Sequence, residues 1–224
     1  AWHIDPKEER VTSKRIYGLS SDKNNICKNV CLRIDNFTPF VYIELPDDVV
    51  WTNSKAQLVG NKIDSLLSQD SRPITKSFIM KKRLYYAHID STNKRIKFPY
   101  LFLSFSSQKD IKTLSYKIRK SLTIAGVGHI QLKMHEQDAS PILQFTCMRN
   151  IPTAGWIKFT GTKVLGDDKL TLCDYEYKVK WKNVSPMESN IIPLPKILAF
   201  DLEVNSTNPR AMPQAHKTGD KIFQ

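Results

Sequence analysis

The residue pair best suited to chemistry is Asp201 and Glu203, which flank Leu202 near the carboxyl-terminal end of the sequence. Alternate residues of a β-strand point to the same face, so the two carboxylates would lie side by side. The apolar run 197–200 before them predicts a strand buried in the centre of a sheet. Buried carboxylates repel each other unless a cation holds them, and Mg²⁺ or Mn²⁺ prefers oxygen ligands. The pair therefore predicts a metal site for phosphodiester hydrolysis, in which two ions about 3.5–4 Å apart activate a water.

The same acidic triplet occurs a second time, at Asp174 and Glu176, so the spacing alone is a weak signal. Aromatic and lysine residues surround this second copy, and they predict the solvent-exposed face of an ordinary hairpin. A purely structural role stays open for Asp201 and Glu203 as well.

Residues 98–105 form an apolar stretch in which Tyr100 and Phe102 would share one face of a sheet and stack on bases. The alternative is that both rings pack beneath a neighbouring domain, and the lack of polar partners on that face favours this alternative. Basic side chains nearby would contact phosphates, or would form a solvated surface only. These residues are Lys81, Lys82, Arg83 and Lys97.

Composition bounds the class of protein. The 224 residues include 34 Lys and Arg against 22 Asp and Glu, a formal net charge of +12, and 41% are hydrophobic. This content excludes a disordered chain, and no apolar run approaches the roughly 20 residues of a membrane-spanning helix. The positive charge favours a polyanionic partner, most commonly nucleic acid. The 4 cysteines are too few for a disulfide scaffold and predict reduced thiols in an intracellular protein.

The elements that must position these residues follow from periodicity and turn chemistry. Strands are predicted at residues 10–17, 30–34, 37–46, 84–89, 98–105, 126–134, 155–159 and 196–204. Helices are predicted at residues 53–67, 106–122 and 138–148. Residues 163–181 predict a hairpin that pairs with the amino-terminal strands. The order favours an α+β sandwich with its helices on one face of a sheet.

Three stretches resemble one known family. Residues 194–203 (Leu-Pro-Lys-Ile-Leu-Ala-Phe-Asp-Leu-Glu) resemble the first exonuclease motif of family B DNA polymerases, where a proline-bearing linker leads into Phe-Asp-x-Glu. Residues 36–43 are similar to the Gly-Phe-x-Pro-Tyr-Phe-Tyr stretch of that family's amino-terminal domain, although Asn36 replaces the glycine. Residues 141–157 resemble the segment before the linker. The three occur in the family's order, as in the polymerases of large eukaryotic DNA viruses.

The resemblance implies a polymerase amino-terminal domain at residues 1–192 and the start of an RNase H-like 3′–5′ exonuclease domain at residues 193–224. The first would combine an OB-like β part (1–76 and 160–190, with one helix) and an RRM-like α/β sandwich (77–159). Asp201 and Glu203 would bind the Mg²⁺ or Mn²⁺ of the proofreading nuclease. Later exonuclease and polymerase aspartates would lie beyond this sequence, so the region is expected to be inactive by itself.

The resemblance also implies the partners of the longer protein, a replicative DNA-directed DNA polymerase. These are template-primer DNA, which this region would touch, deoxynucleotides and a processivity factor. The region itself is expected to be monomeric, away from membranes, in the host cytoplasm (a viral factory) or nucleus. Two other classes stay open. One is a non-enzymatic, basic RNA- or DNA-binding module that uses Tyr100 and Phe102, and the other is a clamp-like, self-associating subunit without metal affinity.

Overall fold

The computed structural model describes residues 2–4, 14–21, 27–81, 97–192, 199, 201, 203–208, 210–214 and 216–223. Within these residues several small sheets and three α-helices form a mixed α+β structure, which confirms the predicted class. None of the helices in the described ranges has the length and apolar character needed to span a bilayer.

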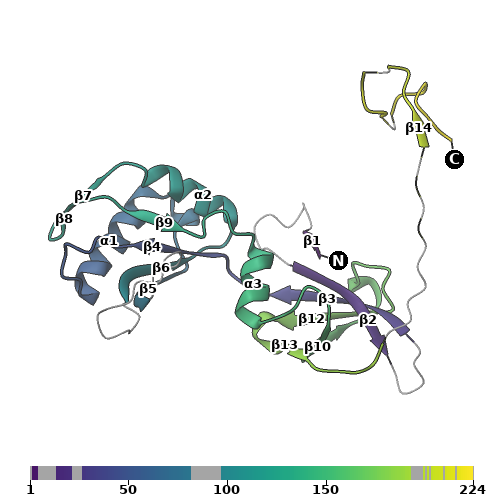
Figure 1. Ribbon diagram of the computed structural model, residues 1–224, viewed down its shortest axis with the longest axis horizontal. Helices are drawn as coiled ribbons and strands as arrows, with labels where there is room; N and C mark the ends of the chain where they lie inside the picture. Colours follow the sequence, from purple (N-terminus) through teal and green to yellow (C-terminus); the bar gives the residue numbers. More distant parts are fainter. Residues whose placement is uncertain are drawn as a thin grey trace.

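A four-stranded antiparallel sheet carries two of the helices on one face (Figure 1). Its strands, in spatial order, are β5 (Thr75–Lys81), β6 (Phe98–Ser104), β4 (Phe40–Glu44) and β9 (Lys133–His135). The helices are α1 (Asn53–Leu66), capped by Thr52, and α2 (Gln108–Lys117), capped by Ser107. Alternate strand residues such as Ile43 and Leu103 face the helices and form the core of this helix-covered sheet.

The second body is a five-stranded sheet with the spatial order β1-β2-β3-β12-β11. Its strands are β1 (Trp2–Ile4), β2 (Lys14–Ser21), β3 (Cys27–Asp35), β11 (Thr162–Val164) and β12 (Tyr175–Lys180). Strand β12 pairs with β11 in antiparallel fashion and with β3 in parallel. The predicted hairpin, and its pairing with the amino-terminal strands, are therefore confirmed.

Helix α3 (Pro141–Arg149) and the pair β10 (Trp156–Phe159) and β13 (Val184–Met187) complete this second body. Ser140 caps α3. Phe145 of α3 packs against Phe37 with 5.6 Å between ring centroids. The side-chain amide of Gln144 donates to the carbonyl of Phe40 (2.7 Å) and its oxygen accepts from the amide of Phe40 (3.2 Å).

These pairings differ from the predicted internal division of residues 1–192. Strand β4 and helix α1 lie within residues 1–76 but join the helix-covered sheet, whereas α3 and β10 lie within residues 77–159 but pack on the second body. The physical reasons are the pairing of β4 with β6 and β9 and the buried contacts of α3 with Phe37 and Phe40. No sheet among the described strands closes into a barrel, so the OB-like and RRM-like descriptions stay predictions.

One helix and one strand were predicted with the wrong extent. The helix expected to reach residue 122 ends at Lys117, and Leu122 begins strand β7 (Leu122–Ile124). The strand expected at 126–134 is divided into β8 (Gly128–Ile130) and β9. Gly126 and Gly128 adopt φ values of 80° and 115°, which turn the chain back so that β7 pairs with β8. The strand expected at 84–89 lies outside the described residues.

Candidate functional site

Asp201 is exposed and lies outside any strand. Strand β14 (Glu203–Asn205) begins two residues later and pairs with β15 (Lys221–Phe223) in a two-stranded sheet. Ala199, the one described residue of the apolar run 197–200, is also exposed and outside a strand. Ala199 and Asp201 are therefore not buried in a sheet centre as the sequence predicted, whereas most of the predicted strand 196–204 lies outside the described residues.

The donor set around Asp201 fits only part of a metal site. Mg²⁺ requires a near-octahedral arrangement of oxygen ligands, several of which are usually waters and substrate phosphates. Within the described part of the chain, no group of three or more His, Cys, Asp or Glu side chains is arranged to hold a metal ion. Asp201 and Glu203 supply two carboxylates at most, so their role as metal ligands stays a prediction.

A carboxylate closes the loop that follows the acidic pair. Asp220, just before β15, accepts hydrogen bonds from the backbone N–H of Thr207 (2.9 Å), the hydroxyl of Thr207 (3.0 Å) and the backbone N–H of Gln214 (2.8 Å). These hydrogen bonds lower the pKa of Asp220, and the bond from the Thr207 backbone amide has the largest effect. The loop is therefore fastened at the end of β15, opposite the strand that begins with Glu203.

Tyr100 and Phe102 lie on the face of the helix-covered sheet that points away from the helices. The Tyr100 side chain is 0% exposed, with its ring centroid 6.0 Å from His135 and 6.3 Å from Tyr42. Phe102 is half-buried, 5.4 Å from Phe40, and packs against the core of the second body. An enclosed ring offers no face to a base, so the structure favours the packing interpretation for Tyr100, and base stacking by the half-buried Phe102 stays a prediction.

The basic residues predicted to bind nucleic acid have different surroundings. Lys97 is exposed at the start of β6, where it can reach a phosphate. Lys81 is half-buried at the end of β5, and its Nζ lies 4.0 Å from the centroid of the Tyr42 ring. Lys82 and Arg83 lie outside the described residues. Nucleic-acid binding by these four residues stays a prediction.

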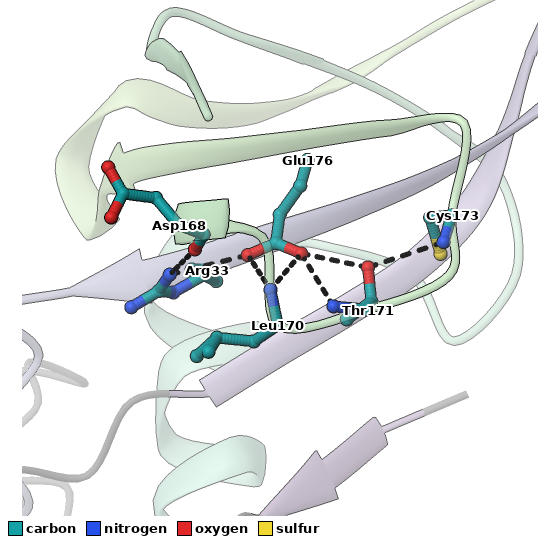
Figure 2. Close-up of polar contacts among 6 residues, drawn as sticks. All are labelled: Arg33, Asp168, Leu170, Thr171, Cys173 and Glu176. Carbon is teal, nitrogen blue, oxygen red and sulfur yellow. Dashed lines mark hydrogen bonds and ion pairs between the residues drawn. The ribbon is translucent and has the colours of Figure 1, made fainter. Parts of the chain in front are cut away.

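The second acidic triplet corrects another expectation. Glu176, predicted on a solvent-exposed face, is 0% exposed. Figure 2 shows its carboxylate at the centre of the loop between β11 and β12. It accepts hydrogen bonds from the Leu170 N–H (3.1 Å), the Thr171 N–H (3.0 Å), the Thr171 hydroxyl (2.8 Å) and Nη1 of Arg33 (3.3 Å). The loop folds back over this face of β12, and no periodicity within the strand could reveal that cover.

The arrangement around Glu176 is structural. Arg33 also donates to the carbonyl of Asp168 (3.5 Å), and the side chain of Asp174 accepts from the Asn29 N–H (2.8 Å). The Glu176 carboxylate is fully engaged by donors from its own chain, so it is not available to a substrate or a metal ion. It orders the loop and ties it to β3.

Comparisons with known proteins agree with the resemblance. The family model described as DNA polymerase family B, exonuclease domain, matches residues 132–224. DNA polymerase 037L of Invertebrate iridescent virus 6 is 34% identical over 250 residues, which cover 100% of this chain and 19% of that protein. DNA polymerase 120R of Invertebrate iridescent virus 3 is 35% identical over 240 residues, which cover 100% of this chain and 20% of that protein. The chain therefore spans about a fifth of the length of these curated relatives.

A solved structure shares the fold. The family B DNA polymerase from the hyperthermophilic archaeon Pyrobaculum calidifontis superimposes with a TM-score of 0.61 at 15% sequence identity. The match covers 100% of this chain and 26% of that one.

Proposed function

Because the chain belongs to the family B DNA polymerases, we propose that it forms the amino-terminal region of a replicative, DNA-directed DNA polymerase with a 3′–5′ proofreading exonuclease. The supporting observation is the 34% and 35% identity to viral DNA polymerases along the whole chain, together with the exonuclease-domain match that contains Asp201 and Glu203. The complete enzyme would use template-primer DNA and deoxynucleotides, with a processivity factor as a further partner. It would act in the cytoplasm or the nucleus of the infected cell.

In this proposal Asp201 and Glu203 contribute carboxylate oxygens to the proofreading site. Mg²⁺ or Mn²⁺, when bound, supplies water activation and stabilises the leaving oxygen. The remaining metal ligands would come from other parts of the longer polymerase. The Asp220 hydrogen bonds to Thr207 and Gln214 tie the loop that follows β14 to the residue before β15.

The remaining residues would support that site and contact the template. We assign residues 1–192 to the amino-terminal domain and residues 193–224 to the start of the exonuclease domain. Lys97, exposed just before β6, would contact DNA phosphates, together with Lys81, Lys82 and Arg83.

The experiment is made in the complete polymerase. Asp201→Ala combined with Glu203→Ala should abolish digestion of a mismatched primer from its 3′ end and leave nucleotide addition unchanged. Asp167→Ala, which removes an exposed acid from the β11–β12 connection, is the matched control and should preserve both activities. Loss of both activities in the double variant would mean that the acidic pair is structural.

The 224-residue chain alone provides a second test. It should not digest single-stranded DNA in the presence of Mg²⁺, because two carboxylates cannot position two metal ions. Digestion that the Asp201→Ala and Glu203→Ala changes remove would contradict the proposed division of ligands between this chain and the rest of the enzyme.

The competing class, a non-enzymatic module that stacks bases on Tyr100 and Phe102, is not favoured because the Tyr100 ring is 0% exposed. Alanine substitution of these residues should lower the melting temperature rather than selectively weaken binding of a single strand.

A further inference from the structure

We propose that helix α2 carries a binding surface for single-stranded nucleic acid, the α2 stripe. The stripe consists of Lys109, Lys112, Tyr116, Arg119 and Lys120. It is distinct from the basic residues 81–83 and 97, and it is not part of the acidic site. The identity of the bound strand, an unpaired template, rests on the proposed function. Binding of a single strand to α2 can be measured without any catalytic activity.

The stripe follows from the helical repeat. Residues three and four apart lie on one side of a helix. Ile111, Leu114 and Ile118 point into the core of the helix-covered sheet and are at most 3% exposed. Lys109, Lys112 and Tyr116 occupy the opposite side, which faces solvent. Figure 1 shows α2 on the outer side of its sheet.

The stripe continues past the end of the helix. Exposed Arg119 and Lys120 follow the last helical residue, Lys117. From Lys109 to Tyr116 the helical rise gives a length of about 10 Å, and Arg119 and Lys120 extend the stripe beyond the helix. Cations spaced over this length can follow successive phosphates of one strand.

All charged side chains of the α2 stripe are positive. Asp110, the acid within α2, is turned toward the start of the helix, where the hydroxyl of Ser107 donates to it (2.8 Å). On one flank, the hydroxyl of Ser115 donates to Gln137 (2.9 Å) in the loop that also carries Glu136 and Asp138. Those acids border the stripe without interrupting it, so a polyanion has a defined path along the helix.

Tyr116 gives the stripe its preference for a single strand. Its side chain is 66% exposed, and the guanidinium carbon of Arg119 lies 4.3 Å from the ring centroid. An exposed aromatic ring in line with cations provides a stacking platform for bases of any sequence. A duplex keeps its bases stacked within the helix, and an acidic peptide has no base to stack, so neither uses this ring.

The test is fluorescence anisotropy with the 224-residue chain and a labelled single-stranded oligonucleotide. Tyr116→Ala should weaken binding by about 5- to 100-fold, and Tyr116→Phe should retain it. Lys109→Ala, Lys112→Ala and Lys120→Ala combined should reduce the slope of log affinity against log salt by about 2. The control combines Lys158→Ala, Lys178→Ala and Lys180→Ala, which remove the same charge from exposed positions on β10 and β12 and should change binding little.

Three results would overturn the proposal. Equal weakening by the two triple variants would mean that net charge alone attracts the strand. Equal affinity for a duplex and for the single strand would mean that Tyr116 does not stack on unpaired bases. Binding of labelled polyglutamate as tightly as the oligonucleotide would instead assign the surface to an acidic protein partner. Circular dichroism melting of each variant establishes that the fold is retained, and failure of the proofreading tests above would leave these binding measurements unaffected.

Discussion

The Oε1 atom of Glu176 lies 3.3 Å from Nη1 of Arg33, across the parallel pair of strands β12 and β3. The two side chains are 0% and 14% exposed. The parallel pairing brings together segments separated by more than a hundred residues, and this ion pair links β12 to β3, while the same carboxylate holds the β11–β12 loop through Leu170 and Thr171. A buried charge that loses its partner remains desolvated, so removal of either side chain lowers the stability of the fold.

Glu176→Ala should lower the free energy of unfolding by about 3–5 kcal/mol, because it leaves Arg33 and the loop donors without their acceptor. Glu176→Gln should be less damaging, since it keeps one acceptor oxygen and removes only the charge. Urea denaturation followed by circular dichroism measures both. Asp167→Ala, an exposed acid in the same connection, is the control and should change stability little. If Glu176→Ala were as stable as this control, the loop would be held by other contacts.

Lys14 predicts a dependence of stability on pH. Its side chain is 1% exposed, Nζ lies 3.8 Å from the centroid of the Phe37 ring, and Nζ has no hydrogen-bond partner. Burial lowers the pKa of Lys14 from 10.5 to about 7. Between these values the unfolded chain binds more protons than the folded one, so the contribution of Lys14 to stability rises with pH across this window.

Lys14→Met removes the buried ammonium but keeps an apolar side chain over Phe37. The variant should be more stable than the parent at pH 7, and its advantage should shrink as the pH rises, by at most about 1.4 kcal/mol per pH unit. Denaturation series at several pH values test this, with Lys158→Met as the exposed control. A difference between Lys14→Met and the parent that stays constant from neutral to alkaline pH would show that Lys14 remains charged in the folded chain.

Gly161 stands where β10 leads into β11, at a close approach of two backbones. A Cβ atom there would lie 2.5 Å from the carbonyl oxygen of Lys178 and 2.7 Å from Cγ2 of Val179. Gly161→Ala should therefore displace β11 from β12 and destabilise the chain by about 1–3 kcal/mol. Gly18→Ala is the matched control, because a Cβ in that strand meets nothing within 4 Å. Equal melting temperatures for the two variants would contradict the clash.

Local signals in the sequence predicted much of this fold. Serine caps precede α2 and α3, and the continuous apolar run 98–105 predicted β6, because these patterns depend on neighbours within a few residues. The burial of Glu176 depends instead on a loop folding back and on Arg33 from a distant strand. Strand β5 was missed because most of its residues are exposed, so it lacks an apolar face.

The environment of the acidic pair, Asp201 and Glu203, was harder to predict than the family. Three stretches in the family's order, residues 36–43, 141–157 and 194–203, together predicted the family, because a family signature is carried by residue types and order. The environment of the acidic pair could not be predicted, because it depends on which strands flank them, and in the described residues β14 has only β15 beside it.

The four cysteines should differ in reactivity according to their burial. Cys31 is 0% exposed on β3, and burial, followed by the nearby Glu176 and Cys173, raises the pKa of its thiol to about 11. Cys147 is exposed on α3. Because the thiolate is the reactive form, iodoacetamide at neutral pH should label Cys147 well before Cys31. Peptide mass spectrometry over time measures the two rates, and urea should make them equal. Glu176→Ala should speed the labelling of Cys31 by loosening the loop beside it, and an unchanged rate in that variant would mean that the core around Cys31 does not depend on the Glu176 carboxylate.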